Sequence, residues 1–368
     1  MEINISRETL VTALQIVTPI TNKSFTKPIL SNFILKADNG KIEFSATDYE
    51  LSIEGTAEAE VKRPGEVCVS AKKLLEAARE FLSDEIRIVL DDQLWITVEG
   101  GSARMRLPSM EIGLYPQMEK ADPPHKFSVR ADELKRTIDL TIFATQANEA
   151  RKNLMGVCLQ LDDGTSTWTS TDGHRLSRVT REVTSQGEAG APDIIIPRKS
   201  LTEMQKVLEG EDQVSVAFSD RILVLTTPQV TLTTRLIEGK FPNVEQVIPK
   251  DSDKQAVIPR ERLINSLKLI SLMSTDKIRP AKLTFALDQL TLESEKVESG
   301  DARDEVSMEY SGDAQEIGFN TRYLLEVLNV LHGDQVEVEL KGALNPVLLR
   351  SPQEPEFLSV VMPLRIEW

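Results

Sequence analysis

The chain has 368 residues, 40% of them hydrophobic, which is enough to bury substantial cores and to form two or three domains. The opening MEINISRETL is charged and polar where a secretory signal needs an apolar run, and no stretch approaches the roughly 20 apolar residues of a membrane span. The net charge of −15 disfavours nucleic-acid binding through a broad basic face, so any such contact must use a local basic surface. We expect a soluble, cytoplasmic protein.

The first third of the chain predicts two helices that are separated and followed by strands. Apolar residues at three- and four-residue spacing predict a helix over 6–17, and the strands ILSNFILKA and KIEFSAT follow it. The strand EVCVS then runs into a second helix, predicted over 70–83. A polar turn and two alternating strands, DEIRIVLDD and LWITVEG, complete the unit.

The other two thirds repeat this order of elements. The middle third predicts helices over 130–141 and 197–208, and the last third predicts them over 259–271 and 320–331. Matching positions recur 124 and 129 residues apart in the first helices, and 127 and 123 residues apart before the second helices. These positions are Leu10, Leu134 and Leu263, and Val69, Ile196 and Phe319. Agreement in all three thirds favours an internal repeat over a chance similarity of amphipathic helices.

The repeat predicts the α+β fold class. We expect three repeated domains, each with two helices packed on antiparallel sheets of about six to eight short strands in all. Polar segments that contain proline, KADPPHKF and PKDSDKQ, mark the boundaries. The predicted domains are residues 1–123, 124–251 and 252–368.

Two cysteines, Cys68 and Cys158, lie in alternating apolar segments, where a buried thiol is the ordinary interpretation. Neither a disulfide nor a zinc site is therefore expected. The sequence has no metal-spaced histidine cluster and no glycine-rich phosphate loop, and we expect no metal and no cofactor. Two of the three histidines, His125 and His332, are predicted in polar turns.

Charge is distributed unevenly between the predicted elements. The six predicted helices carry a net charge of +5, whereas the rest of the chain carries −20. A mildly positive helical layer suits a surface that faces phosphate without binding it tightly. Taken singly, the lysines and arginines of the helices are equally explained as solvated charges, and only a shared face would make them functional.

Three motifs, in this order, carry a resemblance to a known family: TDGHRLS at 171–177, FPNVEQVIP at 241–249 and VVMPLR at 360–365. Together with the repeats, they make the whole chain similar to the bacterial DNA polymerase III beta subunits, the sliding clamps. The resemblance implies a DNA clamp fold and a head-to-tail homodimer that closes into a ring with helices lining the hole. It further implies a processivity factor, not an enzyme, that encircles duplex DNA without sequence preference.

The resemblance also implies a hydrophobic pocket that binds short linear peptides of the replicative DNA polymerase, the clamp loader and repair proteins. Leucine, valine and methionine would form an adaptable floor, while arginine and histidine at the rim would bind peptide carbonyls or a carboxylate. An ordinary last strand of the third sheet also explains VVMPL, and both interpretations stay open. The matching residues are Leu154, Thr171, Gly173, His174, Arg175, Leu176, Pro242, Val247, Val360, Met362, Pro363, Leu364 and Arg365.

Two further surfaces follow from the resemblance. Candidate DNA-facing residues are Lys23, Lys27, Lys72, Asn148, Arg151, Lys152, Arg198 and Lys199. The candidate dimer interface joins the first domain of one copy to the third domain of the other. Its residues are Met105, Leu107, Leu272 and Met273, for which a role in the core is the competing interpretation.

A hydrolase that uses Asp172 and His174 is the catalytic alternative. No third group accompanies the pair, and the related TDYELS at 47–52 indicates that Asp48 and Asp172 are turn residues that bind their own backbone. A peptide-binding scaffold without a DNA role also stays open. Retention on circular DNA, and release when the circle is cut, would distinguish a clamp from such a scaffold.

Overall fold

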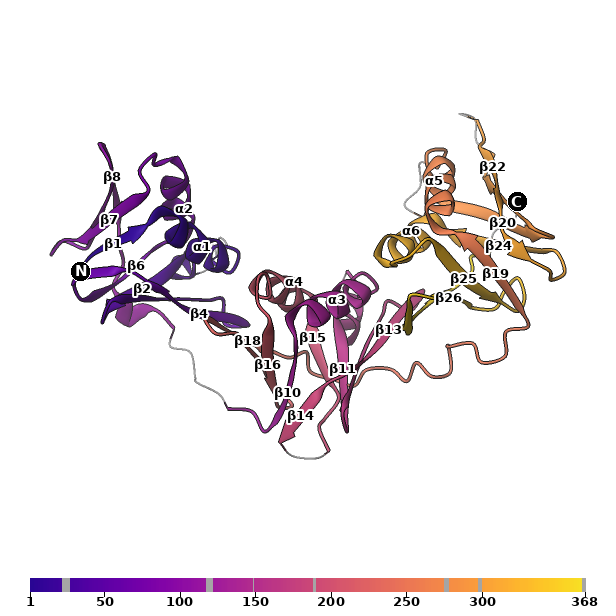
Figure 1. Ribbon diagram of the computed structural model, residues 1–368, viewed down its shortest axis with the longest axis horizontal. Coiled ribbons are helices and arrows are strands. Elements are labelled where there is room, and N and C mark those ends of the chain that lie inside the picture. Colours follow the sequence, from indigo (N-terminus) through magenta and orange to yellow (C-terminus); the bar gives the residue numbers. More distant parts are fainter. Residues whose placement is uncertain are drawn as a thin grey trace. The chain divides into compact units, whose positions relative to one another are not determined.

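The structure is a computed structural model that describes residues 1–21, 27–116, 122–147, 149–187, 190–274, 278–296 and 300–365. Figure 1 shows short helices and antiparallel strands alternating along the chain. The described residues of each third form nine strands and two α-helices, whereas the sequence predicted about six to eight strands. Short strands that precede a helix, such as β1 (Glu2–Ser6), account for part of the difference.

Six α-helices lie where the sequence predicted them, and each begins directly after the last residue of a strand. Side-chain oxygens of Ser6, Ser70 and Asn320 cap three of them by accepting backbone N–H groups of the first turn. The second helix ends at Glu80 rather than Ser83, because Phe81 adopts extended backbone and buries its ring. The helices are α1 (Arg7–Val17), α2 (Ala71–Glu80), α3 (Ala131–Ile142), α4 (Arg198–Val207), α5 (Arg260–Ser271) and α6 (Thr321–Val330).

One nine-stranded antiparallel sheet combines strands of the first and middle thirds. In spatial order it contains β14 (Thr184–Gly187), β10 (His125–Arg130), β16 (Gln213–Phe218), β17 (Ile222–Thr226), β18 (Val230–Arg235), β4 (Leu51–Glu58), β3 (Lys41–Thr47), β2 (Asn32–Asp38) and β6 (Gly65–Ser70). β18 and β4 join the two thirds, with Leu232 opposite Ile53. A continuous ladder of backbone hydrogen bonds therefore connects these repeats.

A second nine-stranded antiparallel sheet combines strands of the middle and last thirds. In spatial order it contains β15 (Ile194–Pro197), β11 (Gly156–Asp162), β12 (Thr165–Thr171), β13 (Arg175–Glu182), β27 (Glu354–Val361), β26 (Val347–Ser351), β25 (Gln335–Leu340), β19 (Lys254–Pro259) and β23 (Glu309–Tyr310). β13 and β27 join the two thirds, with Leu176 opposite Val360. The two junctions are thus built alike.

Two smaller antiparallel sheets complete the fold. One contains, in order, β5 (Glu60–Arg63), β1, β7 (Glu85–Leu90), β8 (Trp95–Gly100) and β9 (Ala103–Pro108). The other contains β22 (Arg303–Ser307), β21 (Gln289–Ser294), β20 (Pro280–Ala286) and β24 (Gln315–Asn320). Within the described part of the chain, β9 and β22 each have a neighbouring strand on one side only.

Helices cover the sheets in pairs. α1 packs beside α2, and α5 beside α6 (Figure 1). The helices bury leucines such as Leu10 and Leu74, while the strands alternate buried and exposed residues. Cys68 and Cys158 are buried as predicted, and burial raises the pKa of each thiol to about 12. His125 was predicted in a polar turn, which is wrong: it begins β10 and its buried ring packs 5.5 Å from that of Phe218.

The chain divides into two compact units. The first contains residues 1–135, 184–190 and 199–236, and the second contains residues 136–183, 191–198 and 237–368. Because each nine-stranded sheet takes strands from two consecutive repeats, the middle repeat is shared between the units. The α+β class with paired helices on antiparallel sheets is confirmed, while the boundaries at 123/124 and 251/252 stay predictions. No helix in the described ranges is long and apolar enough to cross a membrane.

Candidate functional site

A small apolar cavity lies where β12, β13 and β27 meet the segment at 242–247, and its volume is about 180 Å³. It brings together nine of the thirteen residues predicted for the peptide pocket. These are Leu154, Thr171, Gly173, Arg175, Leu176, Pro242, Val247, Val360 and Met362. Arg151, Asn243 and Val244 also line it and were not predicted as pocket residues.

A buried cluster forms the floor of this cavity. Leu176 and Val360, opposite each other on β13 and β27, pack with Val244 and Leu348. Phe241 and Ile248 pack against the same cluster from the two ends of the segment at 241–248. This explains FPNVEQVIP: its apolar residues, three apart at 241, 244 and 247, attach an otherwise irregular segment to the sheet and so make one wall of the cavity. The spacing of Val244 within this motif was the signal that could have identified it as a lining residue.

The turn before β13 forms a second wall. Thr171 donates its hydroxyl to the carbonyl of Arg175 at 2.6 Å, and Asp172 Oδ1 accepts the backbone N–H groups of His174 and Arg175 at 2.9 and 3.1 Å. Gly173 adopts a φ of +88°, a left-handed conformation that glycine reaches without steric cost. The expectation that Asp172 binds its own backbone is therefore confirmed, and the same bonds occur at Asp48, which accepts from Glu50 and Leu51.

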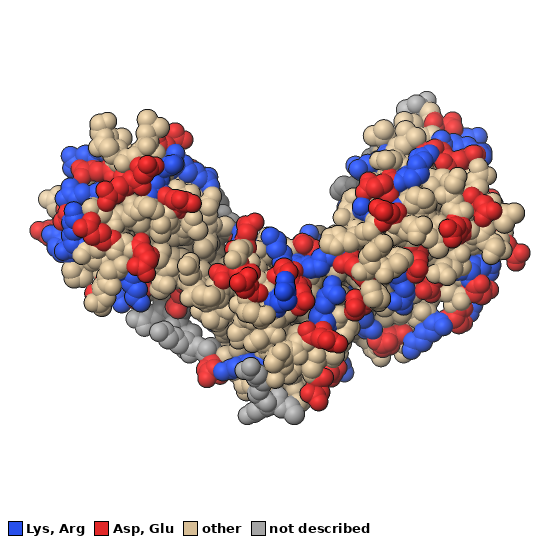
Figure 2. Space-filling model, viewed as in Figure 1, with Lys and Arg blue, Asp and Glu red and all other residues tan. Residues whose placement is uncertain are grey.

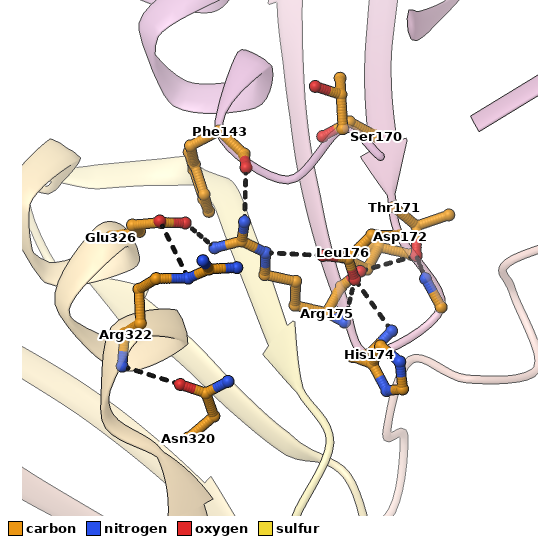
Figure 3. A network of polar contacts seen from close by, with 12 residues as sticks. Phe143, Ser170, Thr171, Asp172, His174, Arg175, Leu176, Asn320, Arg322 and Glu326 are labelled. Carbon is orange, nitrogen blue, oxygen red and sulfur yellow. Dashed lines mark hydrogen bonds and ion pairs between the residues drawn. The ribbon is translucent and has the colours of Figure 1, made fainter. Parts of the chain in front are cut away.

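Arg175 is the centre of a buried ionic network (Figure 3). Its Nε donates to Asp172 Oδ2 at 3.1 Å, its Nη1 pairs with Glu326 of α6, and its Nη2 donates to the carbonyl of Phe143 at 2.7 Å. The guanidinium also lies 4.6 Å from the ring centroid of Tyr323. We expected Arg175 at an exposed rim, but it is 5% exposed and its donors are occupied by the protein itself. It lines the cavity as a support of the turn and of α6.

His174 lies on the other side of the same turn. Its ring stacks with Tyr323 at a centroid distance of 6.2 Å, and both residues line a second, polar cavity of about 470 Å³. Arg175, Arg198 and Arg322 line that cavity as well. Burial, followed by the charge of Asp172, raises the pKa of Tyr323, so its hydroxyl stays protonated at neutral pH.

After β27, the chain continues from the apolar cavity to β24. Met362 donates its backbone N–H to the carbonyl of His174 at 2.8 Å, and Leu364 donates to Gly318 at 2.8 Å. Pro363 and Leu364 are half-buried and Arg365 is exposed. These three residues and His174 do not line the apolar cavity in the described structure, so their predicted role stays a prediction.

The hydrolase alternative finds no support in this geometry. Asp172 uses both carboxylate oxygens for the turn and for Arg175, and the His174 ring stacks on Tyr323. A general base must be within hydrogen-bond reach of its partner, and the carboxylate here is committed to backbone N–H groups and a guanidinium. In the described ranges, no three histidine, cysteine, aspartate or glutamate residues form a metal-binding group.

The described candidate DNA-facing residues belong to several elements of the two units. Lys23 and Asn148 lie outside the described residues. Lys72 on α2 and Lys152 are exposed, Arg151 borders the apolar cavity, and Arg198 and Lys199 begin α4. Lys27 is exposed and donates to the hydroxyl of Tyr49 at 3.0 Å. Their predicted role is not tested by this placement.

The candidate dimer residues differ in exposure. Leu107 on β9 is 3% exposed and thus belongs to the core of one copy, whereas Met105 on the same strand is half-buried. Leu272, directly after α5, is 73% exposed, and the neighbouring Met273 is half-buried. Leu107 therefore fits the core interpretation, and Leu272 has the exposure that an interface residue needs.

Family models match the chain nearly end to end. The N-terminal, central and C-terminal domains of the DNA polymerase III beta subunit match residues 1–119, 128–243 and 245–365. Beta sliding clamps of Pseudomonas putida and Caulobacter vibrioides are 31% and 32% identical to this chain over 368 and 374 residues, with all of each chain covered. The crystal structure of a sliding clamp from Pseudomonas aeruginosa bound to griselimycin matches with a TM-score of 0.94, 31% identity and full coverage of both chains.

These similarities and the repeated helix pairs define a three-domain DNA clamp. The chain belongs to the bacterial beta sliding clamp family, the DNA polymerase III beta subunits, which are processivity factors and have no catalytic role. The predicted clamp fold and the prediction of a non-catalytic replication protein are thereby confirmed.

Proposed function

We propose that two copies of this chain assemble head to tail into a closed ring around duplex DNA in the cytoplasm. The ring tethers the replicative DNA polymerase, the clamp loader and repair proteins, which bind to it through short linear peptides. Encirclement needs few phosphate contacts, because topology rather than affinity keeps the protein on DNA. A chain with a net charge of −15 is compatible with this mode of binding, whereas tight binding to one face would require a strongly basic surface.

The sheet topology supports the ring. In each repeat, the third strand after the first helix is β4, β13 or β22, and the third strand after the second helix is β9, β18 or β27. Two junctions pair one kind with the other, β4 with β18 and β13 with β27. β22 and β9 are left with an open edge among the described residues. Pairing β22 of one copy with β9 of another repeats the same junction twice, and a twofold axis then closes the ring.

The charges of the helices support contact with DNA through the helical layer. The helices as predicted carry +5 and the remainder −20, and several basic side chains on them are exposed. Acidic and basic side chains alternate on the face shown in Figure 2, without a broad area of one sign. This distribution favours weak contacts that slide along phosphate over a fixed binding site.

The apolar cavity supports peptide binding. Val247, which is 42% exposed, and the half-buried Met362 present flexible or accessible apolar groups above the buried floor. Arg151 is exposed at the edge of the cavity and has no ion pair with another described residue. Its guanidinium takes over the role that we had expected for Arg175, binding a peptide carbonyl or carboxylate. A partly exposed apolar cavity with one cation beside it suits a short apolar peptide.

The substitution Val247→Glu tests the pocket, because it places a charge against the apolar floor without changing a residue of the buried core. We expect a dye-labelled peptide from the cognate replicative polymerase to bind about tenfold more weakly or worse, since a carboxylate must lose its hydration there. Gln246→Glu is the control: it adds the same charge one residue away, at a position that does not line this cavity. The affinity of this variant for the peptide should match that of the unmodified protein. Equal affinities of the two variants would contradict the assignment of the pocket.

A further inference from the structure

The turn between β3 and β4 contains a strained residue. Tyr49 has a φ of +77°, close to the +88° of Gly173 in the equivalent turn of the middle repeat. For a residue with a Cβ atom, this left-handed conformation costs about 1–2 kcal/mol. An aromatic side chain therefore occupies a position where the second repeat has glycine. Strain of this kind persists where the surroundings enforce it, and it often marks a functional site.

The backbone around Tyr49 is held by its neighbours. Its N–H donates to Thr47 Oγ1 at 3.0 Å, and Asp48 Oδ1 accepts the N–H groups of Glu50 and Leu51 at 3.0 and 2.8 Å. These bonds fix the turn regardless of the side chain at position 49. The ring is not needed to fill a core, because Tyr49 is 45% exposed.

One lysine contacts this exposed ring, and a second pairs with the residue before it. Lys27 Nζ is 3.0 Å from the hydroxyl of Tyr49 and 4.4 Å from the ring centroid, a cation–π contact. Lys199, in the first turn of α4, pairs with Asp48 Oδ2 of the same turn. All of these residues belong to the first compact unit. The Tyr49 ring is thus exposed and has the ammonium group of Lys27 against it. The ammonium group of Lys199 is bound to Asp48, the residue before Tyr49.

We propose that Tyr49 and Lys27 form a contact with duplex DNA, in which the ring packs against a deoxyribose of the backbone and the ammonium group binds the adjacent phosphate. This inference rests on the proposed encirclement of DNA and identifies one place where the ring touches it. Contacts with the sugar and phosphate carry no sequence preference, and lysine supplies the phosphate contact that positions the ring. A polyanion suits this site better than an apolar peptide, because an ammonium group contacts the ring and Tyr49 does not line the apolar cavity.

Glu50, the next residue, is exposed and carries the opposite charge. It would repel a nearby phosphate, so Glu50→Gln should tighten DNA binding at low salt. Lys27→Gln should weaken it and reduce the slope of log affinity against log salt by about one phosphate contact. Opposite effects of these two substitutions are expected if a polyanion binds near this turn, and the variants of the ring then locate the contact.

The ring itself is tested by Tyr49→Phe and Tyr49→Leu, which share the strained backbone but differ in aromatic character. We expect Tyr49→Phe to bind a dye-labelled duplex within about twofold of the unmodified protein and Tyr49→Leu to bind it about fivefold more weakly, because only Leu loses the flat aromatic face that packs on the sugar. Thermal unfolding is measured on both. A third variant, Tyr49→Gly, relieves the strain, so its affinity should fall without a matching loss of stability.

The outcomes separate this inference from the proposed function. If Tyr49→Leu binds as tightly as Tyr49→Phe, or if affinity falls only in step with thermal stability, the contact is refuted while encirclement stands. If the unmodified protein is not retained on circular DNA after loading, the proposed function itself fails. Peptide binding at the apolar cavity should be the same in all three variants, because Tyr49 and that cavity belong to different compact units.

Discussion

The turns at Thr47–Leu51 and Thr171–Arg175 share one backbone design and differ in their side chains. In both, a threonine hydroxyl donates to the carbonyl at the far end of the turn, at 3.1 and 2.6 Å, and an aspartate accepts two backbone N–H groups. The first turn presents an exposed tyrosine, whereas the second buries an arginine and borders a cavity. The same turn conformation thus supports two different surfaces, and the side chains that it carries determine which surface forms.

The largest expected effect comes from removing the arginine that distinguishes the second turn. Arg175→Ala leaves Asp172 without its ion pair in a buried position, and Glu326 loses a partner. We expect the free energy of unfolding to fall by about 3 kcal/mol, measured by urea denaturation, and peptide binding to be lost with it.

Arg322→Ala is the matched control for that substitution. Arg322 also pairs with Glu326, at 3.5 Å, but its side chain is 54% exposed, so solvent screens the pair. Its loss should cost at most about 1 kcal/mol. Equal destabilisation by the two substitutions would contradict the distinction between a buried support and a surface charge.

A second difference concerns the ion pairs near the two strand junctions. Asp48 and Lys199 form a partly exposed pair, whereas Arg136 on α3 donates to Glu354 on β27 at 2.7 Å and both are largely buried. Burial alone would raise the pKa of Glu354, but hydrogen bonds from Arg136 and from the His332 N–H outweigh it and lower the pKa.

This lowered pKa predicts a dependence of stability on pH. Because Glu354 releases its proton more readily in the folded state, it stabilises the fold above the ordinary pKa of 4.5, and that contribution is lost as pH falls through the lowered value. Glu354→Gln should lose about 2 kcal/mol of unfolding free energy at neutral pH and show a flatter profile in acid. Parallel acid profiles of the two proteins would rule out this role.

The smallest effect concerns the residue with positive φ in the second turn. Gly173→Ala should lower the free energy of unfolding by about 1 kcal/mol, because a residue with a Cβ atom is strained in this left-handed conformation. The strain lies beside the cavity, so peptide binding should also weaken. Gly164→Ala is the control, since Gly164 has a φ of +77°, lies in another hairpin and has open space around its Cβ position. A similar loss of peptide affinity in both variants would contradict this prediction, because a Cβ atom far from the cavity would then weaken binding as much as one beside it.

The fold was largely accessible from the sequence because its signal is periodic and repeated. All six helices carry apolar residues at helical spacing. The same order of helices and strands in each third of the chain then indicated the repeat. The end of α2 was missed because Phe81 is as apolar as a helix residue, and only the fold shows that its ring enters the core through extended backbone. His125 was misplaced because its flanking prolines and lysine resemble a turn, although its ring packs on Phe218.

The site was accessible only in part. The lining residues followed from the family resemblance, but the burial of Arg175 depends on Glu326, which lies 151 residues away and has no local signal. Arg151 was assigned to DNA from the family resemblance, and nothing in the local sequence indicates that it also lines the cavity. Tyr49 went unnoticed because a positive φ is a property of the folded turn that the letters TDYELS do not reveal.

The most direct test of encirclement uses DNA topology. The unmodified protein is loaded onto a nicked circular plasmid with its cognate clamp loader, and the amount retained is followed by gel filtration before and after cutting the circle once. The account predicts stable retention on the circle and release after cutting, because a closed ring slides off a free end. Retention that is unchanged by cutting, or no retention on the closed circle, would contradict it.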